Sequence, residues 1–329
     1  MSDEAREALE AKLQAAVGQP MGAPSEAPDE VNLPMIRHWV DALDDRNPIY
    51  LDAEHAAATR HKALVAPPTM LQAWTMPRPQ IEGIAERGGS SGAINPDNPI
   101  SVLASAGYTG TVATNSDLAF ERYLHLGDRL TASAVLESVS ERKATPLGFG
   151  YFVTWINIWR DQKGEEVGNQ VFRVLKFDPG SAAEAAAEQK PREKKPKDAP
   201  SGEVLPPWSL DVTSTVIVAG AIASRDYMPV HHDADYARAQ GAPHMFMNIL
   251  TTNGYVARYI TDWAGPEAVL REMKIRLGAP AVPGQPLRFT GQVISEREEG
   301  GEKHLEVSIA AANDFGNHAT GTVSLTRPA

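Results

Sequence analysis

Apolar residues recur at helical spacing near the start of the chain. In residues 4–18 (EAREALEAKLQAAVG), Leu9, Leu13 and Val17 fall on one face of a helix, which a Gly-Gln-Pro sequence then ends. Residues 33–45 (LPMIRHWVDALDD) carry a second amphipathic pattern. The chain is therefore predicted to begin with two helices.

Two further helical stretches occupy equivalent places in the two halves of the chain. Residues 53–61 and 234–240 are rich in small residues and follow Asp52 and Asp233, and Asp is a favoured N-cap residue. A longer helical segment then follows in each half, at 69–76 and at 245–264.

Strand patterns close each half. Residues 127–142 of the first half correspond to residues 284–299 of the second, and both stretches are rich in residues that favour strands. Residues 151–177 and 304–328 each predict a hairpin, with turns at Lys163-Gly164 and Phe315-Gly316. Each half thus has helices followed by antiparallel strands. This repeated order predicts two α+β domains of one fold.

A short motif is also present twice. Residues 44–58 (DDRNPIYLDAEHAAA) align with residues 225–239 (RDYMPVHHDADYARA) at one constant offset. The copies differ at an informative position, because Tyr50 stands where the second copy has His231. The matched pairs include Asp45 with Asp226, Pro48 with Pro229, and Asp52 with Asp233.

A polar segment separates the halves. Residues 178–203 contain no aromatic residue and no Leu, Ile or Val, and such a composition cannot bury a core. We therefore predict an N-terminal domain over 1–178, a disordered linker over 179–203 and a C-terminal domain over 204–329.

Composition narrows the classes of function. The formal net charge of −11 argues against nucleic acid as a partner, because binding to phosphates favours a basic face. Cysteine is absent, which excludes disulfides and thiol nucleophiles. The acidic first residues are unlike a secretory signal, and no apolar run is long enough for a membrane span. A cytoplasmic protein is expected.

The second copy of the motif carries a resemblance. Asp226, Pro229, His231 and Asp233, followed by a helix of small residues, resemble the motif of MaoC-like (R)-specific enoyl-CoA hydratases. The segments HWVDALDDRNPIYLD and ALVAPPTM resemble the dehydratase-like N-terminal half of the same families. NILTTNGYVARYITDWAG is similar to the small subunit of actinobacterial steroid side-chain hydratases, which are two-protein assemblies. The resemblance implies a double hotdog with both partners fused in one chain.

The same resemblance implies the site. It places the catalytic pair on Asp226 and His231, as groups that deprotonate a water and deliver a proton to the substrate. The oxyanion hole falls on backbone N–H groups near Asn248 and Ile249, where the family usually has Gly. Met228 is a second departure, since the family usually has Asn at this position.

The N-terminal copy lacks the base, so we expect a catalytically silent half that shapes the pocket. Asp45 is expected to hold a loop turn. Tyr50, Met228 and Arg258 are the candidate substrate-binding residues. Other cationic residues are candidates to bind the phosphates of coenzyme A, namely Arg271, Lys274 and Arg276. The alternative is that they lie on a solvated face.

The size of the substrate follows from a difference between the halves. Pro77 and Pro79 end the helix of the first half early, whereas residues 248–265 contain no proline. The helical turns that the first half lacks leave free volume, which predicts space for a bulky, ring-bearing acyl group unless side chains or the loop 80–100 fill it. A steroid side-chain enoyl-CoA, a homodimer and association with a downstream aldolase are the expectations for substrate and partners.

Two other classes of function remain open at this point. His231-x-Asp233 with His318 and Arg327 has the order of ligands found in non-haem iron, 2-oxoglutarate-dependent oxygenases. A non-catalytic acyl-CoA-binding subunit is the other alternative. The hydratase interpretation, which explains the duplication, requires neither metal nor redox cofactor. His232 lies one position off the motif and is expected to face elsewhere. Three further histidines, which we interpret as structural or surface residues, are His244, His304 and His318.

Overall fold

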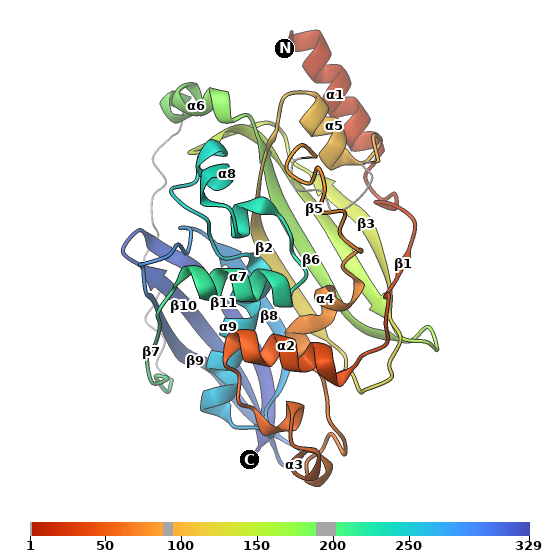
Figure 1. The fold of residues 1–329 in the computed structure, drawn as a ribbon, viewed down its shortest axis with the longest axis vertical. Helices are drawn as coiled ribbons and strands as arrows, with labels where there is room; N and C mark the ends of the chain where they lie inside the picture. Colours follow the sequence, from red (N-terminus) through yellow and green to blue (C-terminus); the bar gives the residue numbers. More distant parts are fainter. Residues whose placement is uncertain (1, 88–94, 189–201) are drawn as a thin grey trace.

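The computed structural model describes residues 2–87, 95–188 and 202–329 (Figure 1). The first half contributes helices and then antiparallel strands. Its helical elements are α1 (Asp3–Ala15), α2 (Leu33–Leu43), η1 (Pro48–Tyr50), α3 (Ala53–Ala58), η2 (Pro68–Met70), α4 (Leu71–Thr75), α5 (Pro99–Ser105), η3 (Pro179–Ser181) and α6 (Ala182–Glu188). Its strands are β1 (Ser25–Glu26), β2 (Gly110–Phe120), β3 (Thr131–Val139), β4 (Lys143–Thr145), β5 (Gly148–Arg160) and β6 (Glu166–Phe177).

The second half repeats this order. Its helical elements are α7 (Ser214–Ala223), η4 (Pro229–His231), α8 (Ala234–Ala239) and α9 (Ile249–Ala264). Its strands are β7 (Trp208–Leu210), β8 (Val269–Leu277), β9 (Leu287–Glu299), β10 (Glu302–Asn313) and β11 (Gly316–Pro328). The predicted helices and both predicted hairpins are present.

All strands of the described residues belong to one sheet. Its order is β1-β3-β5-β6-β2-β8-β11-β10-β9-β7, with β4 paired to β5. The order β3-β5-β6-β2 in the first half is mirrored by β8-β11-β10-β9 in the second. The halves join where β2 and β8 pair antiparallel, with Ser116 opposite Ile275 and Leu118 opposite Met273. This is the predicted double hotdog.

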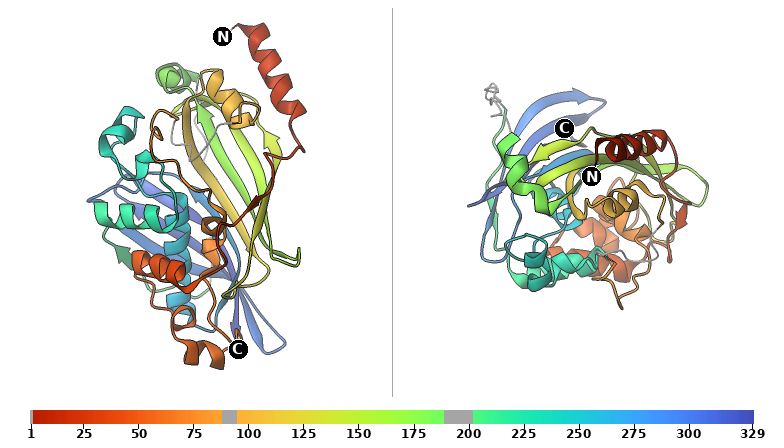
Figure 2. Two further views of the ribbon diagram at one scale, coloured as in Figure 1. Left: turned by 45° about the vertical axis from the view of Figure 1, so that its right-hand side comes forward. Right: turned by 90° about the horizontal axis from the view of Figure 1, so that it is seen from above.

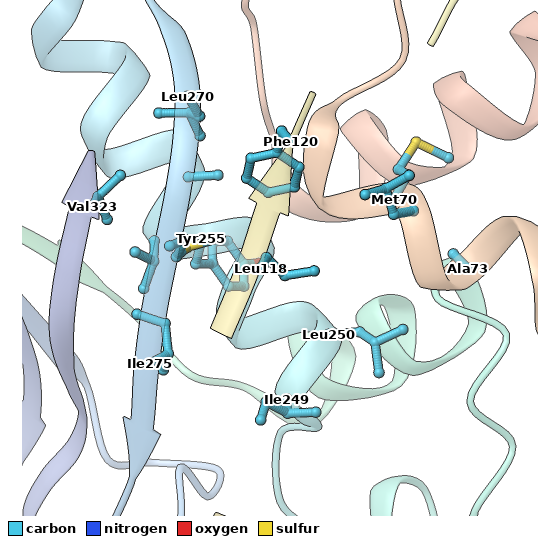
Figure 3. Close-up of a cluster of buried hydrophobic side chains, with 14 of the residues drawn as sticks. Met70, Ala73, Leu118, Phe120, Ile249, Leu250, Tyr255, Leu270, Ile275 and Val323 are labelled. Atoms are coloured by element: carbon cyan, nitrogen blue, oxygen red, sulfur yellow. The ribbon is translucent and has the colours of Figure 1, made fainter. Parts of the chain in front are cut away.

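The long helix α9 forms the centre of the molecule. It lies between the sheet and α7, and α2 packs beside α7 (Figures 1 and 2). Side chains of α9, β2, β8 and the η2–α4 segment form one continuous apolar cluster across the two halves (Figure 3). Residues of this cluster include Met70, Leu118, Leu250, Tyr255 and Leu270. No helix within the described ranges has the length and apolar character needed to cross a membrane.

The repeated motif has the same backbone in both halves. Asp44 and Arg225 are left-handed, with φ of 48° and 59°, and they follow α2 and α7. The next residue in each copy, Asp45 or Asp226, donates its backbone N–H at 2.9 Å to a carbonyl of the preceding helix. Asp52 and Asp233 then cap α3 and α8, as predicted. The duplication seen in the sequence is therefore a duplication of structure.

The central helix is unequal in the two halves. In the first half α4 stops at Thr75, just before Pro77, whereas α9 continues for 16 residues. Proline lacks an N–H donor and clashes within a helix, which explains the early stop.

The predicted disordered linker requires a correction. Within 179–203, residues 179–188 are helical, and Ala185 is fully buried. Small alanine side chains pack this helix against the sheet without bulky apolar residues. At the other end, the carbonyl of Glu203 accepts a hydrogen bond from the N–H of Val293 at 2.8 Å. Residues 189–201 lie outside the described residues.

The helices α7 and α9 cross closely at Gly220. A Cβ atom placed there would lie 2.3 Å from Thr251 Oγ1 and 2.5 Å from its Cγ2. We expect Gly220→Val to destabilise the protein by about 1–3 kcal/mol through overpacking, measured by urea unfolding. Gly22→Ala is the control, because a Cβ at Gly22 meets nothing within 4 Å. Equal stability of Gly220→Val and the wild type would contradict this crossing.

Candidate active site

The loop after α7 brings Asp226 and His231 together. Asp226 lies just before the short helix η4, which begins at Pro229 and ends at His231. Across this tight turn the side chains of Asp226 and His231 face each other. Asp226 Oδ2 and His231 Nε2 are 3.4 Å apart, and their side chains are 19% and 7% exposed. The N–H of Met228 donates to Asp226 Oδ1 at 3.2 Å. The predicted pair thus lies in one largely buried site.

The orientation of His231 determines its chemistry. Its Nδ1 lies 2.7 Å from the backbone carbonyl oxygen of Phe246. A carbonyl only accepts, so Nδ1 carries the hydrogen, and in the neutral ring Nε2 holds a lone pair. That lone pair faces the carboxylate of Asp226. The Nε2 lone pair and Asp226 Oδ2 are both hydrogen-bond acceptors. They are satisfied either by a proton on Nε2 or by a water molecule that donates one hydrogen to each.

The side chain of Asn248 holds Asp226 in place. Its Nδ2 donates to Asp226 Oδ2 at 3.0 Å and to Ser224 Oγ at 2.8 Å. Its Oδ1 accepts from the N–H of Thr251 at 2.8 Å and caps α9. Sequence reasoning assigned only the backbone of Asn248 and missed this role. The available signal was an N-cap residue directly before the long helical segment.

Buried polar groups support the first turn of α9. His318 Nδ1 lies 2.8 Å from the carbonyl oxygen of Ala279, and its Nε2 lies 2.9 Å from Thr252 Oγ1. Burial lowers the pKa of His318, which favours the neutral ring. Thr252 Oγ1 is in turn 3.1 Å from the carbonyl oxygen of Asn248. These bonds give His318 a structural role.

The start of α9 also supplies backbone donors. The N–H groups of the first turn have no acceptor within the helix. The cap from Asn248 uses the N–H of Thr251, which leaves the N–H of Ile249 for another acceptor. This positive end of the helix dipole lies beside Asp226, as the expected oxyanion hole requires.

The N-terminal copy lacks two of these features. Tyr50 replaces the base, and Pro67 stands at the position of Asn248. Tyr50 is 2% exposed, and burial together with nearby Asp45 raises its pKa well above the usual value, so the phenol stays neutral. Burial also raises the pKa of Asp45, whose Oδ1 accepts from the N–H of Asn47 at 3.0 Å. The N-terminal copy therefore forms a turn without a base.

Arg258, a candidate substrate-binding residue, makes several contacts within the chain. Its Nη1 donates to the carbonyl of Leu43 at 2.6 Å, and its Nε lies 3.3 Å from Asp262 Oδ2. The guanidinium also lies 4.9 Å from the centre of the Trp208 ring. Lys274 is likewise paired, with Glu272 at 2.7 Å.

The residues of the oxygenase alternative do not form a metal site. Asp233 Oδ1 accepts two N–H groups of α8, which orients the carboxylate toward the helix. His318 is bonded within the core, and Arg327 lies over the ring of Trp263 at 4.8 Å. Among the described residues, no group of three or more His, Asp or Glu side chains could hold a metal ion.

A cavity of about 280 Å³ lies where α4 ends. Gln72 and Thr75 line it from α4 and Met76 from the residue after the helix, while Trp155 and Trp159 line it from β5. It lies at the place where the early stop of the helix leaves room, and no described residue of the Asp226 and His231 site lines it. Of the loop 80–100, residues 88–94 lie outside the described residues.

Comparisons with known proteins agree with this geometry. Residues 15–170 match the model "FAS1-like, dehydratase domain region", and residues 195–314 match "MaoC like domain". A "3-oxo-4,17-pregnadiene-20-carboxyl-CoA hydratase beta subunit" of Mycobacterium tuberculosis is 42% identical over 125 residues, 38% of this chain and 94% of that protein. The corresponding alpha subunit is 41% identical over 175 residues, 52% of this chain and 53% of that protein.

A "Probable enoyl-CoA hydratase alpha subunit" of Thermomonospora curvata is 42% identical over 201 residues, 59% of each chain. The chain thus spans between half and three-fifths of the length of these alpha subunits. A solved MaoC-like dehydratase aligns with a TM-score of 0.71 at 20% identity, covering 96% of this chain and 99% of that one. A Mycobacterium tuberculosis protein described as a double hotdog aligns with a TM-score of 0.60 at 14% identity, covering 93% and 96%. The chain belongs to the MaoC-like dehydratase family.

Proposed function

We propose that the chain catalyses the reversible addition of water to a trans-2-enoyl-CoA. The observation that carries this proposal is the pair of Asp226 and His231, 3.4 Å apart, with Nδ1 of His231 on the carbonyl of Phe246. This arrangement presents two acceptors to one water, which is what activation of a water nucleophile needs.

The reaction then proceeds with the chain's own groups. His231 Nε2 takes a proton from the water as its oxygen bonds to C3 of the substrate. The electrons of the C2–C3 double bond move toward the thioester carbonyl, and the N–H of Ile249 donates to the resulting oxyanion. A proton held between Asp226 and His231 is delivered to C2, and the pair returns to its starting state. The addition changes no redox state, so the proposal includes no redox cofactor.

Asn248 acts in this scheme as a positioning residue. We expect Asn248→Ser to lower kcat by roughly 10-fold or more, because a charge-assisted hydrogen bond to Asp226 is lost. Serine can still cap α9, so thermal unfolding should change little. Steady-state kinetics and a melting curve test this together. An unchanged kcat would remove Asn248 from the scheme.

The substrate we propose is a ring-bearing enoyl-CoA. The named alpha and beta subunits act, by their names, on a steroid carboxyl-CoA, and this chain is similar to both. The cavity at the end of α4 supports the same substrate class. The hydrated product is a 3-hydroxyacyl-CoA, which an aldolase can cleave, so we propose such an enzyme as the next step and as a partner. We also propose a homodimer.

The remaining alternative is a non-catalytic acyl-CoA-binding subunit. The intact pair at Asp226 and His231 favours an enzyme. A hydration assay over a panel of short, medium-chain and ring-bearing enoyl-CoA thioesters decides between them. A subunit without activity would bind these thioesters and hydrate none.

A further inference from the structure

The cavity at the end of α4 has both polar and apolar walls. Trp155 and Trp159 of β5 line it together with Met21 and Met76. Its volume of about 280 Å³ is slightly below the range of typical ligand pockets, roughly 300–1,000 Å³. Flat aromatic walls suit a fused ring system, which presents two broad apolar faces.

Most polar groups in this wall already have partners. The Nε1–H of Trp155 donates to Asn157 Oδ1 at 3.1 Å, and Nδ2 of Asn157 donates to Gln170 at 3.0 Å. The Nε1–H of Trp159 donates to Thr75 Oγ1 at 2.8 Å. These bonds hold the tryptophan rings in place. Trp155 is half-buried, whereas Trp159 is 1% exposed.

Gln72 is the exception. It lines the cavity, and its Oε1 is buried without a hydrogen-bond partner among the described residues. An unpaired buried oxygen destabilises a protein, so such an atom calls for a partner from outside the chain. The amide also carries donors on Nε2. Rotation by 180° about χ3 exchanges the positions of the Nε2 donor and the Oε1 acceptor. The same side chain can therefore hydrogen-bond to a ketone or to a hydroxyl.

The cavity and the active site lie on elements that adjoin in the fold. Gln72 lies on α4, which continues directly from η2, and η2 packs against α9. The first turn of α9 carries Asn248, which holds Asp226. Met70 of η2 and Leu250 of α9 share one apolar cluster (Figure 3). A contact between substrate and Gln72 therefore requires that a long acyl group extends from the reacting carbons past η2, so that its far end meets Gln72.

We propose that Gln72 is a specificity residue that hydrogen-bonds an oxygen at the end of the ring system remote from the thioester. This inference rests on the proposed function and adds to it a requirement for a polar substituent on the rings. The site discriminates against rings without that oxygen, because binding them leaves the buried amide unpaired.

The test compares Gln72→Met with the wild type on ring-bearing enoyl-CoA substrates that carry a ketone, a hydroxyl or no oxygen at the remote end. We expect Gln72→Met to lower kcat/KM about 10-fold for the oxygen-bearing substrates, the effect of one hydrogen bond, and to change it less than about twofold for the deoxy substrate. The ketone and hydroxyl arms show which group the amide prefers. Gln240→Met is the control, because Gln240 is exposed at the end of α8. An equal loss for all three substrates, or no loss, would overturn the proposal.

Binding provides a readout that does not depend on turnover. The saturated ring-bearing acyl-CoA with and without the remote oxygen can be titrated by tryptophan fluorescence, since Trp155 and Trp159 line the cavity. We expect Gln72→Met to weaken only the oxygen-bearing ligand. If the protein hydrates straight-chain thioesters but no ring-bearing ones, the proposed role of Gln72 is overturned. The assignment as a hydratase is then retained. Selective binding without any hydration supports Gln72 and overturns the proposed function.

Discussion

The variants Asp226→Asn and His231→Ala are each expected to lower kcat for enoyl-CoA hydration at least about 100-fold, as loss of a general acid or base does. Alanine removes the Nε2 lone pair that faces Asp226 Oδ2 at 3.4 Å. Asparagine replaces a carboxylate oxygen by an amide, which cannot accept and return a proton. Initial rates at saturating substrate measure the effect.

His232 provides the control for this pair. It is the next residue in the chain, yet its Nε2 lies 3.1 Å from the carbonyl oxygen of Tyr227, and its side chain is exposed. We expect His232→Ala to keep most of the activity and the stability. An inactive His232→Ala beside an active His231→Ala would show that the catalytic histidine has been misassigned.

The second large effect concerns substrate size. We expect kcat/KM for a steroid-like ring-bearing enoyl-CoA to exceed that for crotonyl-CoA by about 100-fold or more, because contacts with the remote rings contribute binding energy to the transition state. The short helix α4, five residues against the 16 of α9, leaves the cavity that these rings would occupy. A medium-chain enoyl-CoA should fall between them. A preference for crotonyl-CoA would contradict this account of the cavity.

Much of the fold follows from local sequence signals. The apolar spacing in residues 4–18 and 33–45 predicts α1 and α2, and Asp52 and Asp233 predict the starts of α3 and α8. These signals depend on neighbouring residues, so they can be read without the tertiary structure. Comparing the two copies of the motif also predicts which half carries the base.

The remaining features depend on tertiary contacts. Asn248 reaches Asp226 from another element, and the tautomer of His231 is set by a backbone carbonyl, which has no residue-type signal. Arg258 looked free as a cation on a helix, but its partners Leu43 and Asp44 come from the other half of the chain. The helix α6 was missed because its burial relies on alanine, which composition alone does not mark as core.

The most direct test of the central claim is incubation of the purified full chain with a ring-bearing trans-2-enoyl-CoA in ¹⁸O-labelled water, followed by mass spectrometry of the thioester. The account predicts a product heavier by one labelled water, formed by the wild type and at least about 100-fold more slowly by Asp226→Asn. Absence of any water adduct from the whole panel of enoyl-CoA thioesters, or equal formation by Asp226→Asn, would contradict it.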